Sequence, residues 1–248
     1  MKTLATYNIK GGVGKTASAV NLAYIASKNR LRVLLWDLDP QGAASFYFRI
    51  RPEIKGGGRK LVHKKKTINH AIKATNYDSL DLLPSDFSFR DMDLYLDREK
   101  KSDRRFVKLL DQVREEYDLV IFDCPPSISL VSENVFHAAD ALLIPTIPTH
   151  LSFRAYEQLK KFIIEQERIS VSLFPYLYMV DRRKKIHRDF AGKFLQLYPE
   201  GLKTQIASSS TVEKMGIYCA PVPVFDSSSE VAMAFSQLWD ETWQRLLY

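Results

Sequence analysis

The chain has 248 residues, of which 46% are hydrophobic and 26% are charged. This balance is typical of a globular protein with a large buried core, and no apolar run is long enough to span a bilayer. The first residues predict a strand entering a loop and lack the apolar core of a signal peptide. Two cysteines, Cys124 and Cys219, argue against a disulfide framework. We therefore expect a cytoplasmic protein.

The formal net charge of +7 is concentrated in one segment. Residues 49–66 contain eight Lys or Arg and one Glu, and basic and acidic residues are equal in number in the rest of the chain. Three consecutive glycines, Gly56–Gly58, add flexibility, so the segment predicts a basic flexible surface loop. Such a loop is typical of contact with a polyanion, and a solvated charged loop is an equally good interpretation.

Short apolar runs alternate with helical patterns along the chain. The apolar runs predict strands at Lys2–Asn8, Arg32–Asp37, Ser79–Leu83, Leu119–Asp123, Ala141–Pro145 and Leu173–Val180. The other patterns predict helices at Lys15–Asn29, Thr67–Lys73, Phe106–Glu116, Phe153–Gln166, Arg188–Leu197 and Ser229–Leu247. This alternation predicts an α/β fold in one domain, residues 1–248, with a doubly wound, mostly parallel sheet and helices on both faces.

The motif KGGVGKT at Lys10–Thr16 follows the first predicted strand and opens the first predicted helix. Its glycines let the backbone N–H groups turn inward around phosphates, and the helix N-terminus adds partial positive charge. Lys15 is suited to the β- and γ-phosphates of ATP, and the Thr16 hydroxyl to Mg²⁺. The motif predicts a P-loop NTPase whose nucleotide-binding residues are Gly11, Gly12, Val13, Gly14, Lys15, Thr16 and Ala17.

Two acidic motifs follow predicted strands. The sequence DLDPQG at Asp37–Gly42 ends the second strand, and DCPPS at Asp123–Ser127 ends the strand LVIFD. Ligands of open parallel sheets bind beyond the carboxyl ends of the strands, so both motifs are expected beside the phosphate loop. An Asp in this position is a candidate to hold Mg²⁺, and Asp123 fits that role.

Together these motifs resemble those of the ParA/MinD superfamily of partition and positioning ATPases, whose deviant phosphate loop carries an extra lysine, here Lys10. The resemblance implies that Lys10 contacts the nucleotide of the partner subunit in an ATP-dependent homodimer. It implies that Asp39 positions or activates the attacking water and that Asp37 lies near the metal. The predicted catalytic residues are thus Lys10, Lys15 and Asp39, and the predicted Mg²⁺ site comprises Thr16, Asp37 and Asp123.

The resemblance extends along the chain through SLDLLPSD (Ser79–Asp86), SENVFHAADALLIPT (Ser132–Thr146) and LYMVDRRKKIH (Leu177–His187). The last segment implies that Met179 and Asp181 lie near the nucleotide. Two departures are Ala17, where a second Thr is usual, and Ile206-Ala207-Ser208, where many members have Ile-Pro-Arg. The contacts that select adenine therefore stay open.

The resemblance implies an ATP hydrolase that is associated with the nucleoid, binds nonspecific DNA and is triggered by a ParB-like or cargo adaptor protein. The candidate DNA contacts are Arg182, Arg183, Lys184, Lys185 and Arg188, for which a solvated cluster is the competing interpretation. A MinD-like membrane-positioning ATPase and a nucleotide-gated regulator with little turnover are competing functions. The acidic C-terminal helix argues against binding to a membrane. Its apolar residues are expected to pack on the core: Trp239, Trp243, Leu246 and Leu247. The presence of Asp39 argues against a regulator with little turnover.

Overall fold

The computed structural model describes residues 1–63, 68–99 and 102–248, which form an eight-stranded sheet of order β3-β4-β2-β5-β1-β6-β7-β8. All neighbouring strands are parallel except β3 and β4. The strands are β1 (Lys2–Thr6), β2 (Val33–Asp37), β3 (Lys73–Ala74), β4 (Leu80–Leu83), β5 (Leu119–Asp123), β6 (Ala141–Thr146), β7 (Ser172–Val180) and β8 (Gln205–Ala207). The predicted fold class is confirmed.

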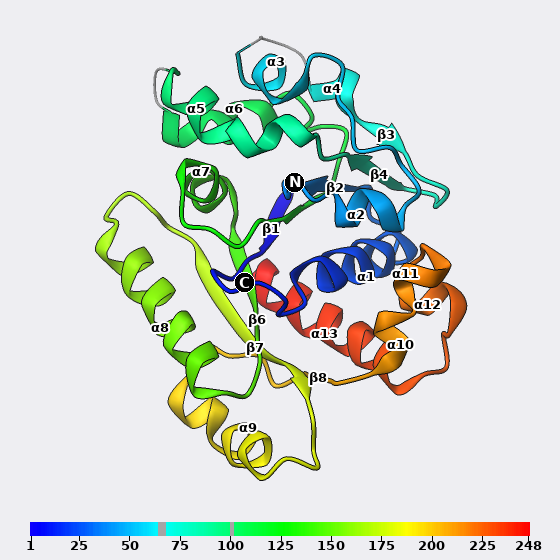
Figure 1. Ribbon diagram of the computed structural model, residues 1–248, viewed down its shortest axis with the longest axis vertical. Helices are drawn as coiled ribbons and strands as arrows, with labels where there is room; N and C mark the ends of the chain where they lie inside the picture. Colours follow the sequence, from blue (N-terminus) through cyan, green and yellow to red (C-terminus); the bar gives the residue numbers. More distant parts are fainter. Residues whose placement is uncertain (64–67, 100–101) are drawn as a thin grey trace.

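Helices cover both faces of this sheet (Figure 1). Those longer than one or two turns are α1 (Lys15–Lys28), α7 (Leu130–Ala138), α8 (His150–Glu165), α9 (Lys185–Leu197) and α13 (Glu230–Leu247). The shorter ones are α2 (Ala43–Tyr47), α3 (Gly57–His63), α4 (Ile68–Ala71), α5 (Met92–Asp97), α6 (Arg105–Leu110), α10 (Ser210–Glu213), α11 (Met215–Tyr218) and α12 (Val222–Phe225), with 3-10 turns at Phe87–Asp91 and Ser102–Arg104.

The central strands are apolar on both sides because each side has its own core. In β5, Leu119 and Ile121 join the core beneath α1 and α13, whereas Val120 and Phe122 join the core beneath α5 to α8. Successive side chains of a strand point to opposite faces, so a continuous apolar run is what a strand buried on both sides requires.

The C-terminal helix α13 packs against α1 (Figure 1). Trp239 and Leu246 are buried as expected, but Leu247 is 52% exposed, so its predicted packing is wrong. Among the residues that the structure describes, none of the helices combines the length and hydrophobicity that a membrane span needs.

Residues 49–63 are more ordered than their charge suggests. The prediction of a loop throughout 49–66 is wrong for Gly57–His63, which form α3, because Leu61 and Val62 are buried in the core. Residues 64–66 lie outside the described part of the chain. The helix predicted at Thr67–Lys73 is shorter, since β3 begins at Lys73, and Thr67 also lies outside the described residues. The helix predicted at Phe106–Glu116 ends at Leu110 and continues as turns.

Candidate nucleotide-binding site

The phosphate loop joins β1 to α1 through backbone conformations that favour glycine. Gly12 and Gly14 have φ of 71° and 96°, values that side chains rarely adopt. At Gly14 there is a second constraint, because an added Cβ would lie 2.2 Å from Cε1 of Tyr178 in β7. The loop is therefore shaped both by its own backbone and by the packing of a tyrosine that is distant in sequence.

Lys15, the first residue of α1, has a buried side chain. Its Nζ donates a hydrogen bond to the carbonyl oxygen of Lys10 at 3.1 Å, so the ammonium group lies over the loop. Burial lowers the pKa of Lys15, while the charges of Asp123 and Asp39 act in the opposite direction. An ammonium group held by one carbonyl can exchange that bond for a phosphate oxygen at little cost.

Asp37 and Asp123 end neighbouring parallel strands, lie opposite each other in register and are fully buried. Asp37 Oδ2 accepts hydrogen bonds from the backbone N and Oγ of Ser45, at 2.8 and 2.7 Å. Burial raises the pKa of Asp37 to about 6. Burial also raises the pKa of Asp123 well above its usual range, and the charge of Asp37 adds to this. Two buried carboxylates side by side are costly unless a cation joins them.

The oxygen atoms at this place are suitable ligands for Mg²⁺. Asp123 Oδ2 is buried and finds no hydrogen-bond donor within residues 1–63, 68–99 and 102–248, and the Thr16 hydroxyl interacts with the same carboxylate. In that part of the chain, no group of three or more His, Cys, Asp or Glu could hold a metal by itself. Mg²⁺ needs no such group, since it binds through one or two protein oxygens together with phosphates and water.

Asp39 lies in the loop after β2 and is half-buried. Its Oδ1 accepts a hydrogen bond from the backbone N of Gln41 at 3.0 Å, and its own N donates to Asp37 Oδ1 at 3.3 Å. Its charge acts on both Lys15 and Asp123. The structure thus brings Lys15, Asp37, Asp39 and Asp123 together at one edge of the sheet, as the motif positions predict.

Lys10 is half-buried beside the loop. Its backbone N donates to Asn8 Oδ1 at 2.9 Å, and its Nζ lies 3.4 Å from Oγ of Ser152 in the first turn of α8. Asn8 also binds the carbonyl of Pro145 at the end of β6 through its Nδ2. Lys10 is therefore anchored by its backbone while its ammonium group reaches across the sheet edge.

The other predicted loop residues follow the same arrangement. Gly11 and Gly12 are exposed, Val13 is buried in the core, and Thr16 and Ala17 are half-buried in the first turn of α1. Exposed backbone before a helix N-terminus is what phosphate binding requires.

Met179 and Asp181, at the end of β7, differ from each other in their surroundings. Met179 has φ of 55° at an irregularity of the β7–β8 pairing and is 38% exposed. The Asp181 carboxylate accepts hydrogen bonds from Nε and Nη2 of Arg183 at 2.9 and 3.0 Å. These bonds lower the pKa of Asp181 to about 2. The roles of both residues in nucleotide binding stay predictions.

The five predicted DNA contacts are clustered at the start of α9, where all five are exposed in the loop and first turn, but they are not equivalent. Arg183 is paired with Asp181, and Arg188 Nη1 donates to the carbonyls of Arg182 and Arg183 at 2.7 and 3.0 Å. Within the described residues, no ion pair engages Arg182, Lys184 or Lys185. These three side chains are therefore the cations best placed to meet phosphates.

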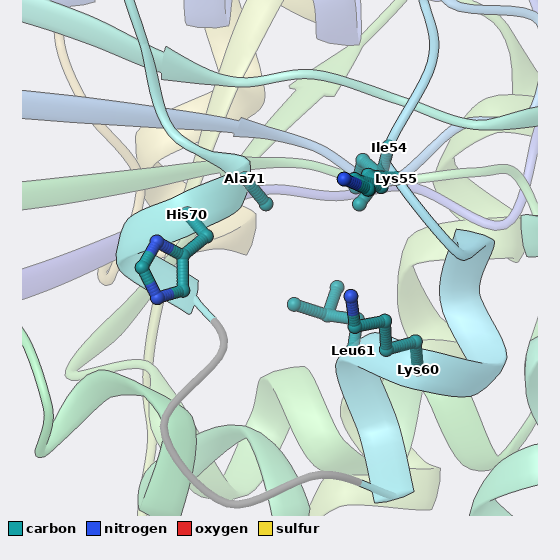
Figure 2. Close-up of a pocket in the computed structure, with 6 residues that line it drawn as sticks. All are labelled: Ile54, Lys55, Lys60, Leu61, His70 and Ala71. Atoms are coloured by element: carbon teal, nitrogen blue, oxygen red, sulfur yellow. The ribbon is translucent and has the colours of Figure 1, made fainter.

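A separate cavity of about 390 Å³ lies between α3 and α4. Figure 2 shows Lys55 and Lys60 on one side of it and His70 on the other. Its remaining lining consists of Ile54, Leu61 and Ala71. The lining residues all lie outside the phosphate loop, so this cavity is distinct from the nucleotide site.

Several residues of the site were not predicted from the sequence. Asn8 and Ser152 hold Lys10, Tyr178 packs on Gly14, and Ser45 and Ser85 hold the loop that carries Asp39. Ser85 follows β4, so the rule that ligand-binding groups follow strand ends could have indicated it. Ser45 and Tyr178 lie inside other elements and give no such signal.

Comparisons of this sequence with known proteins also indicate a nucleotide-binding protein. The family model described as an AAA domain matches residues 1–172, and the fold and phosphate loop are those of a P-loop NTPase. The sporulation initiation inhibitor protein Soj of Bacillus subtilis is 27% identical over 246 residues, covering 97% of both chains. A ParA family protein of Chlamydia pneumoniae is 29% identical over 247 residues, again covering 97% of both.

Among solved structures, the ATP complex of a Cyanothece McdA variant superposes with a TM-score of 0.85, at 19% identity, covering 98% of this chain and 96% of that chain. This likeness establishes the fold. The family match and the two relatives show that the chain belongs to the ParA-like partition ATPases of the ParA/MinD superfamily.

Proposed function

We propose that this protein is a Mg²⁺-dependent ATPase that dimerises when it binds ATP, binds DNA without sequence preference and positions or segregates a cargo. The cargo is a plasmid, a chromosome or a protein assembly on the nucleoid, and an adaptor protein triggers hydrolysis. The observation that carries the proposal is the buried Oδ2 of Asp123, which has no donor within the described residues. Asp123 lies opposite Asp37 in register, and the Thr16 hydroxyl acts on its carboxyl group. A carboxylate of this kind is costly to the ligand-free protein and becomes favourable when a cation is bound.

The reaction is phosphoryl transfer from ATP to water. Backbone N–H groups of Gly11–Gly14 and the Lys15 ammonium bind the β- and γ-phosphates. Thr16 and Asp123, with Asp37 behind them, would hold Mg²⁺, which neutralises charge on the phosphate oxygens. Asp39 orients the attacking water, and the charges of Lys15 and Lys10 stabilise the transition state.

The dimerisation step rests on the role that the family resemblance gives to Lys10. Its Nζ lies 3.4 Å from Ser152 Oγ in α8, and in a two-ATP sandwich this ammonium group would exchange that contact for the nucleotide of the second subunit. ATP then favours the dimer because only the dimer completes both sites. DNA binding is assigned to Arg182, Lys184 and Lys185, since exposed cations bind phosphates by releasing counterions and without reading sequence.

The test is DNA binding by the purified protein with ATP, with ADP, and as Asp39→Ala with ATP, each at two salt concentrations. Salt-sensitive DNA binding by the wild type with ATP and by Asp39→Ala with ATP, but not with ADP, is expected. ATP turnover is measured in parallel and is expected to be lost in Asp39→Ala. Turnover without DNA binding in any nucleotide state would leave the ATPase and overturn the DNA-based cycle.

A further inference from the structure

A buried pair of serines joins the catalytic loop to strand β4. The strands β2 and β4 are parallel neighbours, so the segments that follow them emerge at the same sheet edge. Ser85, two residues beyond β4, is fully buried, as is Ser45 in α2. Ser85 Oγ donates to the carbonyl oxygen of Asp39 at 2.5 Å, and Ser85 N donates to Ser45 Oγ at 3.0 Å.

Ser45 links Ser85 to Asp37, so that hydrogen bonds connect Ser85 with both Asp37 and Asp39. Ser45 Oγ accepts from Ser85 and donates to Asp37 Oδ2 at 2.7 Å. One residue after β4 therefore binds the backbone of Asp39 directly and the carboxylate of Asp37 through one hydroxyl. Ser85, Ser45 and Asp37 are all fully buried, and at such positions solvent cannot replace a lost hydrogen bond.

We propose that Ser85 is a positioning residue for Asp39, fixing the loop so that the Asp39 carboxylate meets the attacking water. This inference rests on the proposed ATPase function, in which Asp39 orients that water. Ser85 is fully buried and its hydroxyl donates to the Asp39 carbonyl, so it acts through Asp39.

The other bonds of the loop show why Ser85 matters. Leu38 N donates to the carbonyl of Asp123 at 2.9 Å, and Gly42 N donates to the carbonyl of Asp39 at 2.9 Å. The first bond fixes the start of the loop, and the second lies within the loop's own turn. Ser85 supplies a tie from the loop to β4, on the side opposite β5 in the sheet order. Without it, the loop can shift as a unit, and a displacement of about 1 Å can cost about a hundredfold in rate.

The next residue extends this junction away from the nucleotide. Asp86 Oδ2 accepts from the backbone N of Ile54 at 2.8 Å, and Ile54 lines the basic cavity shown in Figure 2. Ser85 thus binds the loop that carries Asp39, and Asp86 binds Ile54 in the basic segment of residues 49–66.

The experiment compares Ser85→Ala and Ser85→Cys with wild type. Cysteine is close in shape to serine but is a weak donor, so it removes the strong hydrogen bond without leaving a cavity. The matched control is Ser27→Ala, because Ser27 is also buried and its Oγ donates to a backbone carbonyl, that of Tyr24, at 2.8 Å. For each protein the ATP affinity, the kcat and KM of hydrolysis, and the thermal unfolding temperature are measured.

Both Ser85 variants are expected to lose about tenfold or more in kcat with KM changed less than about twofold, because the lost interaction acts on the water-orienting group and not on ATP binding. Ser27→Ala is expected to match wild type. Unchanged kcat in Ser85→Cys, or equal losses of ATP affinity and kcat, would overturn the positioning role. Wild-type turnover no higher than that of Asp39→Ala would instead refute the ATPase function itself, so the two failures are distinguishable.

Discussion

Gly14→Ala tests the idea that the phosphate loop is shaped by tertiary packing as well as by its motif. Gly14 has φ of 96°, and a left-handed conformation costs an alanine about 1–2 kcal/mol. The new methyl group would also lie 2.2 Å from the Tyr178 ring, and overpacking of a buried site typically costs about 1–3 kcal/mol. We therefore expect Gly14→Ala to lower the free energy of unfolding by about 2–5 kcal/mol, a large part of the total for a domain.

The assay is urea denaturation of the ligand-free protein, so that lost nucleotide binding does not enter the result. Gly11→Ala is the matched control, because no atom lies within 4 Å of its added Cβ and its φ is not in the left-handed region. The control is expected to lose less than about 1 kcal/mol. A loss below about 1 kcal/mol in Gly14→Ala would refute the packing argument.

A double-mutant cycle separates the two causes. Combining Gly14→Ala with Tyr178→Ala removes the ring that the methyl group meets, so the two losses are expected to sum to more than the loss in the double variant. Simple additivity would assign the whole effect of Gly14→Ala to its backbone conformation.

Three further predictions concern charge. Asp123→Asn should stabilise the ligand-free protein more at pH 8 than at pH 5 in urea denaturation, because a raised carboxylate pKa means that stability is lost as pH rises. It should also lose the rise in unfolding temperature that Mg²⁺ and ATP give wild type. Asp86→Asn should lower stability more at pH 7 than at pH 3. Burial opposes ionisation of Asp86, but hydrogen bonds from Ile54 and Ser88 outweigh it and lower its pKa, so this stability is lost as pH falls through the folded-state pKa. Replacing Arg182, Lys184 and Lys185 together by Glu should weaken ATP-dependent DNA binding and reduce its salt dependence. The affinity for ATP should not change.

Each of these has a contrary outcome. A stability increase for Asp123→Asn that is independent of pH would show that ionisation is not the cause. An Asp86→Asn deficit as large at pH 3 as at pH 7 would assign the loss to packing. DNA binding that survives reversal of the three cations would move the interface elsewhere. Lys161→Glu, at a residue that pairs with Glu165 on the surface of α8, changes the net charge by the same two units as a single reversal such as Lys184→Glu and is the matched control for that variant.

The sequence was sufficient for the parts of the protein that depend on local order. The motif Lys10–Thr16 follows a strand and opens a helix, so its place in the fold and the glycines that its backbone needs are encoded within a few residues. Asp37 and Asp123 end apolar strands, and in a parallel sheet such ends meet at one edge. For that reason, the fold class and the grouping of Lys15 with the three acidic residues were predictable.

Segments with mixed signals were predicted less well. In residues 49–66 the charges dominate the composition, yet burial of Leu61 and Val62 decides that Gly57–His63 form a helix. A short helix of this kind gains little from its own sequence and depends on packing. The same reasoning explains why the helix predicted at Thr67–Lys73 gives way to β3, whose pairing with β4 is a contact between separate segments.

Local sequence patterns were therefore enough to place a phosphate loop and two strand-end carboxylates in an alternating α/β chain. The tertiary structure was needed to find three contacts: Ser85 binds the carbonyl of Asp39, Tyr178 packs on Gly14, and Arg183 pairs with Asp181. The first two contacts join positions far apart in the chain, and the third depends on side-chain conformation. Such contacts form only when the folded backbone brings their atoms within hydrogen-bonding or van der Waals distance.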